Sequence, residues 1–96
     1  MNNTHLDELL DELRIHIKLL LAHSEVTWAR VLENLGNQAQ NDIKHAASEL
    51  LRLFGGMGSY NDLVLYEGGQ VLTKANDELA AARNRLFQLC TIIKAA

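Results

Sequence analysis

Residues 54–66 read Phe-Gly-Gly-Met-Gly-Ser-Tyr-Asn-Asp-Leu-Val-Leu-Tyr, and this stretch decides how the chain is organised. It has three glycines within four positions, followed by an apolar run that is too short for a helix. Clustered glycine disfavours a helix because glycine loses much conformational freedom when it is ordered. The sequence on both sides has helical periodicity, so the stretch predicts a specific non-helical connection between helices.

Two kinds of nucleotide-binding loop use similar glycine spacing, but neither fits. A phosphate-binding P-loop has a lysine after its glycines and a strand before them, and this segment has neither. A dinucleotide fingerprint requires glycine or alanine where this chain has Asn61. We therefore interpret the segment as a helix stop and a tight turn. Gly55 is expected in the left-handed C-cap conformation, and Ser59 or Asn61 is expected to cap the next short element.

The residues after this turn allow two structures. Residues 63–66 and 71–73 are separated by Glu-Gly-Gly-Gln at 67–70, a pattern typical of a small β-hairpin. An irregular or single-turn helical crossover is the other interpretation. Two short strands are marginally stable in water, so either structure is expected to pack on the helices.

The clearest helix is predicted over about residues 4–23, where apolar residues recur at three- and four-residue spacings. Thr4 is the expected N-cap, and the carboxylates that follow it suit the positive end of the helix dipole. The residues expected to face the core are Leu6, Leu9, Leu10, Leu13, Ile17, Leu20 and Leu21.

A second, smaller apolar patch lies on the opposite side of this helix, where Ile15, Leu19 and Ala22 fall together. Four acidic residues precede it, before Arg14, the first basic residue of the chain. Helix-start chemistry explains such acidic residues in many proteins, and another part of the fold can cover an apolar patch. Alternatively, the charges steer a basic partner onto the patch. On that hypothesis the partner-binding residues are Asp7, Glu8, Asp11, Glu12, Ile15 and Leu19.

Three more helices are expected. Ser24 is the predicted N-cap of a second helix over about residues 25–35, with Trp28 as its core anchor and Gly36 as its stop. A third helix is predicted from residue 41 or 42 to residue 54.

The last helix is predicted to begin after Thr73 or Asn76 and to end near Lys94. Cys90 falls on its apolar side. Because no histidine lies near it in the sequence, we interpret Cys90 as a small core residue and not as a nucleophile.

The titratable residues form no recognisable reactive group. His16 and His23 lie seven residues apart on one flank of the first helix, with Glu12 one turn before His16. A metal site needs three or four convergent ligands, so a boundary or solvated histidine pair is expected instead. The conceivable acid–base residues are His16, His23, His45, Asp62 and Glu67. Their spacing offers no positioned pair, and we therefore assign no catalytic residue, metal or cofactor.

The composition is that of an ordinary globular protein, with 48% hydrophobic and 22% charged residues among 96. A chain of this size holds one core, so residues 1–96 are expected to form a single helical domain. The nine lysines and arginines are scattered, which argues against nucleic acid as a partner. No apolar stretch approaches the roughly 20 residues that span a membrane. A single cysteine and the lack of a signal-peptide pattern predict a cytoplasmic protein.

The glycine-rich segment is part of a longer motif. Residues 50–65 are Leu-Leu-Arg-Leu-Phe-Gly-Gly-Met-Gly-Ser-Tyr-Asn-Asp-Leu-Val-Leu. An Asn-Asp-Glu-Leu segment at 76–79 and an Arg-Leu-Phe-Gln-Leu helix end follow. The combination resembles a family of small uncharacterised bacterial proteins that share Phe-Gly-Gly-Met-Gly-Ser, then an aromatic residue or leucine, then Asn-Asp-Leu. The resemblance covers about residues 50–90 and no part of the first two helices.

This resemblance implies a bacterial origin and a similar helical fold, and it supplies no reaction and no catalytic residue. It makes the glycine-rich loop the segment most worth testing for function. The loop residues concerned are Gly55, Gly56, Met57, Gly58, Ser59, Tyr60, Asn61 and Asp62.

The predicted fold is all-α or nearly so, with four helices and residues 55–73 as a packed crossover. The small size, the acidic segment and the spare apolar patch favour a protein-binding module. Within that class we expect a bacterial immunity protein or antitoxin-like inhibitor that neutralises a toxin by direct binding. The alternative is a homo-oligomeric structural or regulatory helical protein without catalytic activity, which associates through Ile15 and Leu19.

Overall fold

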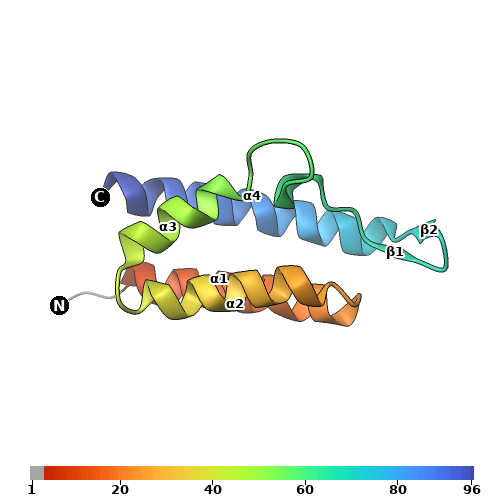
Figure 1. Ribbon diagram of the computed structural model, residues 1–96, viewed down its shortest axis with the longest axis horizontal. Helices are drawn as coiled ribbons and strands as arrows, with labels where there is room; N and C mark the ends of the chain where they lie inside the picture. Colours follow the sequence, from red (N-terminus) through yellow and green to blue (C-terminus); the bar gives the residue numbers. More distant parts are fainter. Residues whose placement is uncertain (1–3) are drawn as a thin grey trace.

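The computed structural model describes residues 4–96, in which four α-helices are arranged as a bundle (Figure 1). The helices are α1 Thr4–Ala22, α2 Val26–Ala39, α3 Ile43–Arg52 and α4 Thr73–Ala95. A 3₁₀ turn η1, Tyr60–Asp62, and two short strands, β1 Tyr66–Glu67 and β2 Gln70–Val71, lie between α3 and α4. The described chain is 74% helical, which confirms the predicted nearly all-α fold.

Each helix contacts the next one along the chain, and α4 also contacts α1. In Figure 1, α1 and α2 lie together as a helical hairpin, and α4 runs along the bundle above them with α3 beside its C-terminal part. The described residues measure 47 × 24 × 20 Å along the principal axes. The long axis follows α4, and the small hairpin is at the end where α4 begins (Figure 1).

The core is built mainly from leucines on the inner faces of the helices, as the periodicity predicts. Cys90 is fully buried among them, which agrees with its interpretation as a core residue. Leu21 is an exception, because it lies at the outer edge of the contact between α1 and α2 and is half exposed. The fully buried leucines are Leu9, Leu20, Leu32, Leu50, Leu65, Leu79 and Leu86.

The turn between α1 and α2 corrects the predicted role of Ser24. Ser24 has φ 65°, and it donates its backbone N–H to Leu21 O, while Glu25 donates to Leu20 O at 2.9 Å. This is the Schellman arrangement that closes a helix C-terminus. Ser24 therefore ends α1, and the N-cap of α2 is Glu25, whose side chain makes no capping hydrogen bond.

The predicted stop at Gly36 is also wrong, since α2 continues through it to Ala39. Gly36 is buried against α1, and a Cβ built there would lie 3.4 Å from Leu13 Cδ1. The glycine thus serves close helix packing. At the other end of the chain the described part of α1 includes Thr4, so the expected N-cap is already a helical residue.

The third helix ends two residues earlier than residue 54, the predicted end. Asp42 is the N-cap of α3, and its side chain accepts a hydrogen bond from His45 N at 3.1 Å. The α-helix ends at Arg52. The next residues form i to i−3 hydrogen bonds, which include Gly55 N to Arg52 O at 3.4 Å. Such 3₁₀-type bonds satisfy the last carbonyls. Gly55 does not have positive φ, so the predicted left-handed C-cap at Gly55 is wrong. The left-handed residues are Gly56 with φ 84° and Gly58 with φ 73°.

Of the two structures that the sequence allows after the loop, the hairpin is present. Tyr66 pairs with Val71 and Glu67 with Gln70 in an antiparallel register. Gly68 and Gly69 form its two-residue turn, and both have positive φ as a type I′ turn requires.

Candidate functional site

The glycine-rich loop is anchored by Tyr60, the largest fully buried side chain of the described residues. Its backbone N–H donates to Leu53 O at 2.8 Å, which ties the loop to the end of α3. Its ring lies 5.0 Å from that of Trp28 and 5.9 Å from that of Phe54, measured between centroids. The loop is therefore packed into the core by an aromatic residue whose burial the sequence does not predict.

His16 binds this tyrosine from the opposite side of the core. The prediction of a boundary or solvated histidine is wrong, because His16 is completely buried. Its Nε2 lies 2.9 Å from Ala82 O and its Nδ1 lies 2.6 Å from Tyr60 Oη. A carbonyl oxygen can only accept, so Nε2 carries the proton and Nδ1 accepts from the tyrosine hydroxyl.

Burial lowers the pKa of His16 and raises the pKa of the Tyr60 phenol, so both groups are neutral at pH 7. A neutral donor and a neutral acceptor, each satisfied, form a stable internal contact. This pair joins α1, the loop and α4. We assign it a structural role, since both groups are enclosed by the core.

Two polar side chains of α4 hold the loop and hairpin in place, and a third, within the loop, closes its turn. Arg83 donates through one guanidinium nitrogen to Tyr60 O at 2.8 Å and to Leu63 O at 3.0 Å. Asn76 accepts from Leu65 N and donates to Leu65 O and Leu72 O. Asp62 accepts from Gly58 N at 3.0 Å, as a turn-stabilising residue should. The Arg83 contacts join residues 20 and 23 positions apart, so no local sequence pattern predicts them.

The two predicted capping residues of the loop act differently. Ser59 occupies the N-cap position of η1 but makes no side-chain capping bond, and its Oγ is buried without a hydrogen-bond partner. Asn61 is exposed and lines a pocket instead. Turn chemistry is therefore carried by Asp62.

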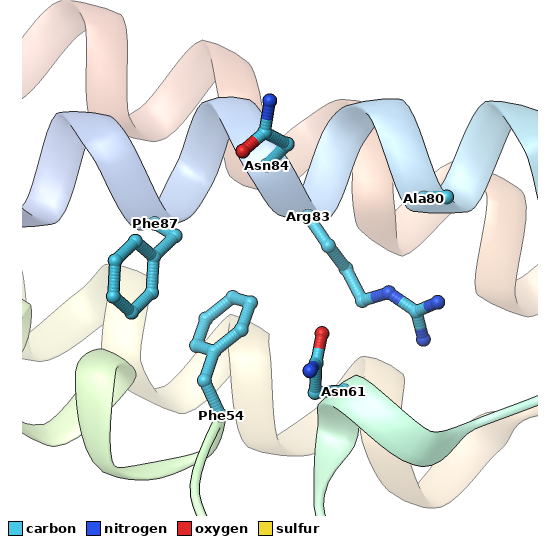
Figure 2. A pocket seen from close by; sticks show the side chains of 6 residues that line it. All are labelled: Phe54, Asn61, Ala80, Arg83, Asn84 and Phe87. Atoms are coloured by element: carbon cyan, nitrogen blue, oxygen red, sulfur yellow. The ribbon is translucent and has the colours of Figure 1, made fainter.

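The pocket beside Asn61 has a volume of about 270 Å³ and lies between the loop and α4. Figure 2 shows Phe54 and Asn61 of the loop facing Phe87 and Arg83 of α4, whereas Asn84 points away from them. The rings of Phe54 and Phe87 meet edge to face with centroids 5.4 Å apart. One guanidinium nitrogen of Arg83 already donates to two loop carbonyls. We therefore interpret the pocket as a consequence of how the loop is anchored to α4, and not as a ligand site.

The acidic residues predicted to bind a partner separate into two groups. Asp7, Glu8 and Asp11 are exposed on α1, and Asp11 accepts from Arg14 at 2.6 Å. Glu12 differs, because its side chain is only 11% exposed and accepts two hydrogen bonds from Arg85. Its carboxylate also lies 3.4 Å from His16 Nε2. The Glu12 carboxylate is therefore paired inside the protein. Of the four acidic residues predicted to bind a partner, the other three are exposed.

The apolar patch next to these carboxylates is only partly covered by the fold. Ile15 is 49% exposed, and Leu19 packs partly against the core. They line a groove of about 520 Å³ between α1 and α4. Its lining residues are Ile15, Lys18, Leu19, Ala22, Glu78, Ala81 and Arg85. The sequence allowed either a covered patch or a docking surface, and the structure has an open groove with an apolar floor.

The remaining candidate residues do not converge. Within residues 4–96, no three histidine, cysteine or acidic side chains come close enough to hold a metal ion. His45 lies on the surface with Glu49 as its neighbour, at 3.8 Å between Nε2 and Oε1. Burial raises the pKa of the Cys90 thiol to about 12, which keeps it protonated and unreactive.

None of the helices in the described part of the chain has the length and apolar character needed to cross a membrane.

The fold and these surfaces define a class: a small four-helix protein with an anchored glycine-rich loop and an open groove between α1 and α4. The chain belongs to the family described as "Domain of unknown function (DUF6966)", whose model matches residues 21–73. The match confirms that this is an uncharacterised family. It includes α2, which the resemblance seen in the sequence left out, and stops where α4 begins. No curated protein and no solved structure matches the chain significantly.

Proposed function

We propose that this protein is a protein-binding module that docks a basic protein partner on the surface formed by α1 and α4. One observation carries the proposal: three exposed carboxylates, Asp7, Glu8 and Asp11, lie on the same helix as an open apolar groove. Interfaces of this kind combine a desolvated apolar centre with charges that guide the encounter.

The charges favour a basic occupant. The chain has a formal net charge of −3, and its most acidic stretch is the beginning of α1. Two cations border the groove, Arg85 and Lys18, and one carboxylate, Glu78. The charge of Arg85 is balanced by Glu12. Complementary charge accelerates association and rejects acidic partners, while burial of Ile15 and Leu19 slows dissociation.

Within this class, we propose a bacterial, cytoplasmic immunity protein or antitoxin-like inhibitor that neutralises a toxin by direct binding. Support comes from the small helical fold and from the reactive groups, which are buried or dispersed among the described residues. A stoichiometric inhibitor needs a binding surface and a stable fold, and no reaction of its own.

A second candidate is self-association through the same groove. Lys18 and Arg85 on its border are opposite in charge to Glu78, so a second copy could place unlike charges together. Light scattering separates the two: a monomer at micromolar concentration contradicts self-association, and a dimer that Ile15→Asp converts to a folded monomer supports it.

The proposal is tested by co-expressing the chain with the product of the adjacent gene. We expect restored growth if that product is toxic, together with a complex that Ile15→Asp abolishes. The matched control is Leu21→Asp, since Leu21 is 53% exposed on another flank of α1. Equal loss of binding in both variants, or full binding by Ile15→Asp, would contradict docking in the groove.

A further inference from the structure

A second pocket, of about 320 Å³, lies where the glycine-rich loop and the start of the hairpin meet α2. We propose that it binds an ammonium cation, specifically the side chain of a lysine presented by a partner. The residues that carry this inference are Trp28, Asp62 and Tyr66.

Two aromatic side chains line the pocket. Trp28 is half-buried and rests on Tyr60, which fixes its position, and Tyr66 is 57% exposed on β1. Tryptophan and tyrosine attract cations through the negative potential of their ring faces, and ammonium groups are commonly recognised between such rings. Val64 and Leu63 add apolar wall for the methylene chain of a lysine.

The exposed Asp62 carboxylate of the pocket is an acceptor suited to the same ligand. One oxygen of Asp62 is held by Gly58 N, and in residues 4–96 its carboxylate makes no ion pair within 4.0 Å. An ammonium group has three donors and no acceptor, so it can bind the Asp62 carboxylate directly.

The loop is preorganised for this task. Gly58 is left-handed, and its N–H fixes Asp62, while Tyr60 anchors the segment between them in the core. Arg83 interacts with Asp62 at longer range, but its guanidinium is bound to the carbonyls of Tyr60 and Leu63, and it does not line the pocket. An anion would face the Asp62 carboxylate and is therefore disfavoured.

This inference goes beyond the proposed function, because it rests on residues that lie outside the groove between α1 and α4. The two can fail separately. A cation site would persist in the Ile15→Asp variant, and loss of the cation site would leave docking in the groove intact.

The test uses Trp28, the single tryptophan of the chain, as a fluorescent reporter inside the pocket. The probes are N-acetyl-lysine methylamide, its Nζ-trimethyl form and its neutral Nζ-acetyl form, titrated at constant ionic strength. We expect saturable changes with the two cations and at least about 5-fold weaker binding of the neutral form, given the energy of cation–aromatic contacts. Equal binding of the neutral form, or no saturable signal with either cation, would overturn the proposal.

Variants assign the effect to the pocket. Asp62→Asn keeps an oxygen that can accept from Gly58 N, so the loop should stay folded while cation binding weakens about 5- to 10-fold. Tyr66→Leu should weaken binding, and Tyr66→Phe should restore it because the ring remains. Glu67→Gln, next to Tyr66 but outside the pocket lining, is the matched control and should bind as the unmodified protein does. Wild-type binding by both Asp62→Asn and Tyr66→Leu would contradict the assignment.

Discussion

At the scale of single residues, Tyr60 and His16 explain why a segment rich in glycine has a defined structure. The tyrosine is buried from the loop side and the histidine from α1, and their side chains meet at 2.6 Å. Position 16 lies on the same helix face as the buried Leu13 and Leu20, so periodicity predicts its burial. It could not predict the partner, because Tyr60 lies outside any periodic segment. The contact spans 44 residues of sequence.

The buried histidine predicts acid sensitivity. The pKa of His16 is lowered in the folded state, so the unfolded chain takes up the proton first as the pH falls below about 6.5. Stability is therefore complete above pH 6.5 and should fall with decreasing pH below it, by up to about 1.4 kcal/mol per pH unit until the folded histidine also protonates. Urea unfolding between pH 7.5 and 5 measures this.

The control for that experiment is His45→Gln, which removes a surface histidine of α3 and should leave the slope unchanged. A free energy of unfolding that stays constant from pH 7 to pH 5 would show that His16 is not held neutral by the fold.

Ser24 gives a prediction of the opposite sign. A serine with φ 65° occupies a position where glycine has no steric cost. Ser24→Gly is expected to stabilise the protein by about 1 kcal/mol, measured by urea unfolding. Ser48→Gly, inside α3, should instead destabilise it, because a helical glycine costs backbone entropy. A destabilising Ser24→Gly would mean that the turn is not left-handed in solution.

At the scale of secondary structure, the helices could be predicted from the sequence, and their ends could not. The apolar spacing identifies all four helices and the inner face of α4. The predicted helix ends at Ser24, Gly36 and Gly55 rest on residue type alone. Ser24 closes a helix by backbone bonding, and Gly36 allows close packing on α1, so tertiary structure decides what each residue type does.

The loop glycines provide the test at this scale. Gly56 has φ 84° with open space around a Cβ, so Gly56→Ala is expected to cost about 1–2 kcal/mol from backbone strain alone. Gly55→Ala should cost little, because Gly55 does not have positive φ. Thermal or urea unfolding of the two variants compares them directly. A larger loss of unfolding free energy in Gly55→Ala than in Gly56→Ala would support the left-handed C-cap that the sequence predicts at Gly55.

At the scale of the whole molecule, one surface was partly predictable. The acidic start of α1 and the Ile15–Leu19 patch could be predicted from the sequence, but α4 completes the groove with Glu78, Ala81 and Arg85, which are distant in sequence. The internal use of Glu12 was also hidden, since its partner Arg85 comes from α4. A helical wheel describes the faces of one helix, whereas this groove is formed by two helices, so the wheel of α1 alone could not predict it.

Surface charge should control the rate at which a partner binds. Replacing Asp7, Glu8 and Asp11 with their amides is expected to slow association and flatten its salt dependence, with little effect on dissociation. Glu12→Gln should lower stability instead, because Arg85 loses its charged partner. Stopped-flow binding and urea unfolding distinguish these effects. Unchanged association in the triple variant would remove charge steering from the mechanism.

Site-specific photo-crosslinking in the native host tests the docking surface most directly. p-Benzoylphenylalanine placed at Ile15 should form one discrete adduct with a basic protein, and Leu19→Asp should abolish that adduct. The same group at Leu21, with a similar exposed fraction of 53% against 49% for Ile15, should not form it. Adducts of equal yield at both positions, or adducts at position 15 only with a second copy of this chain, would contradict a basic protein partner in the groove between α1 and α4.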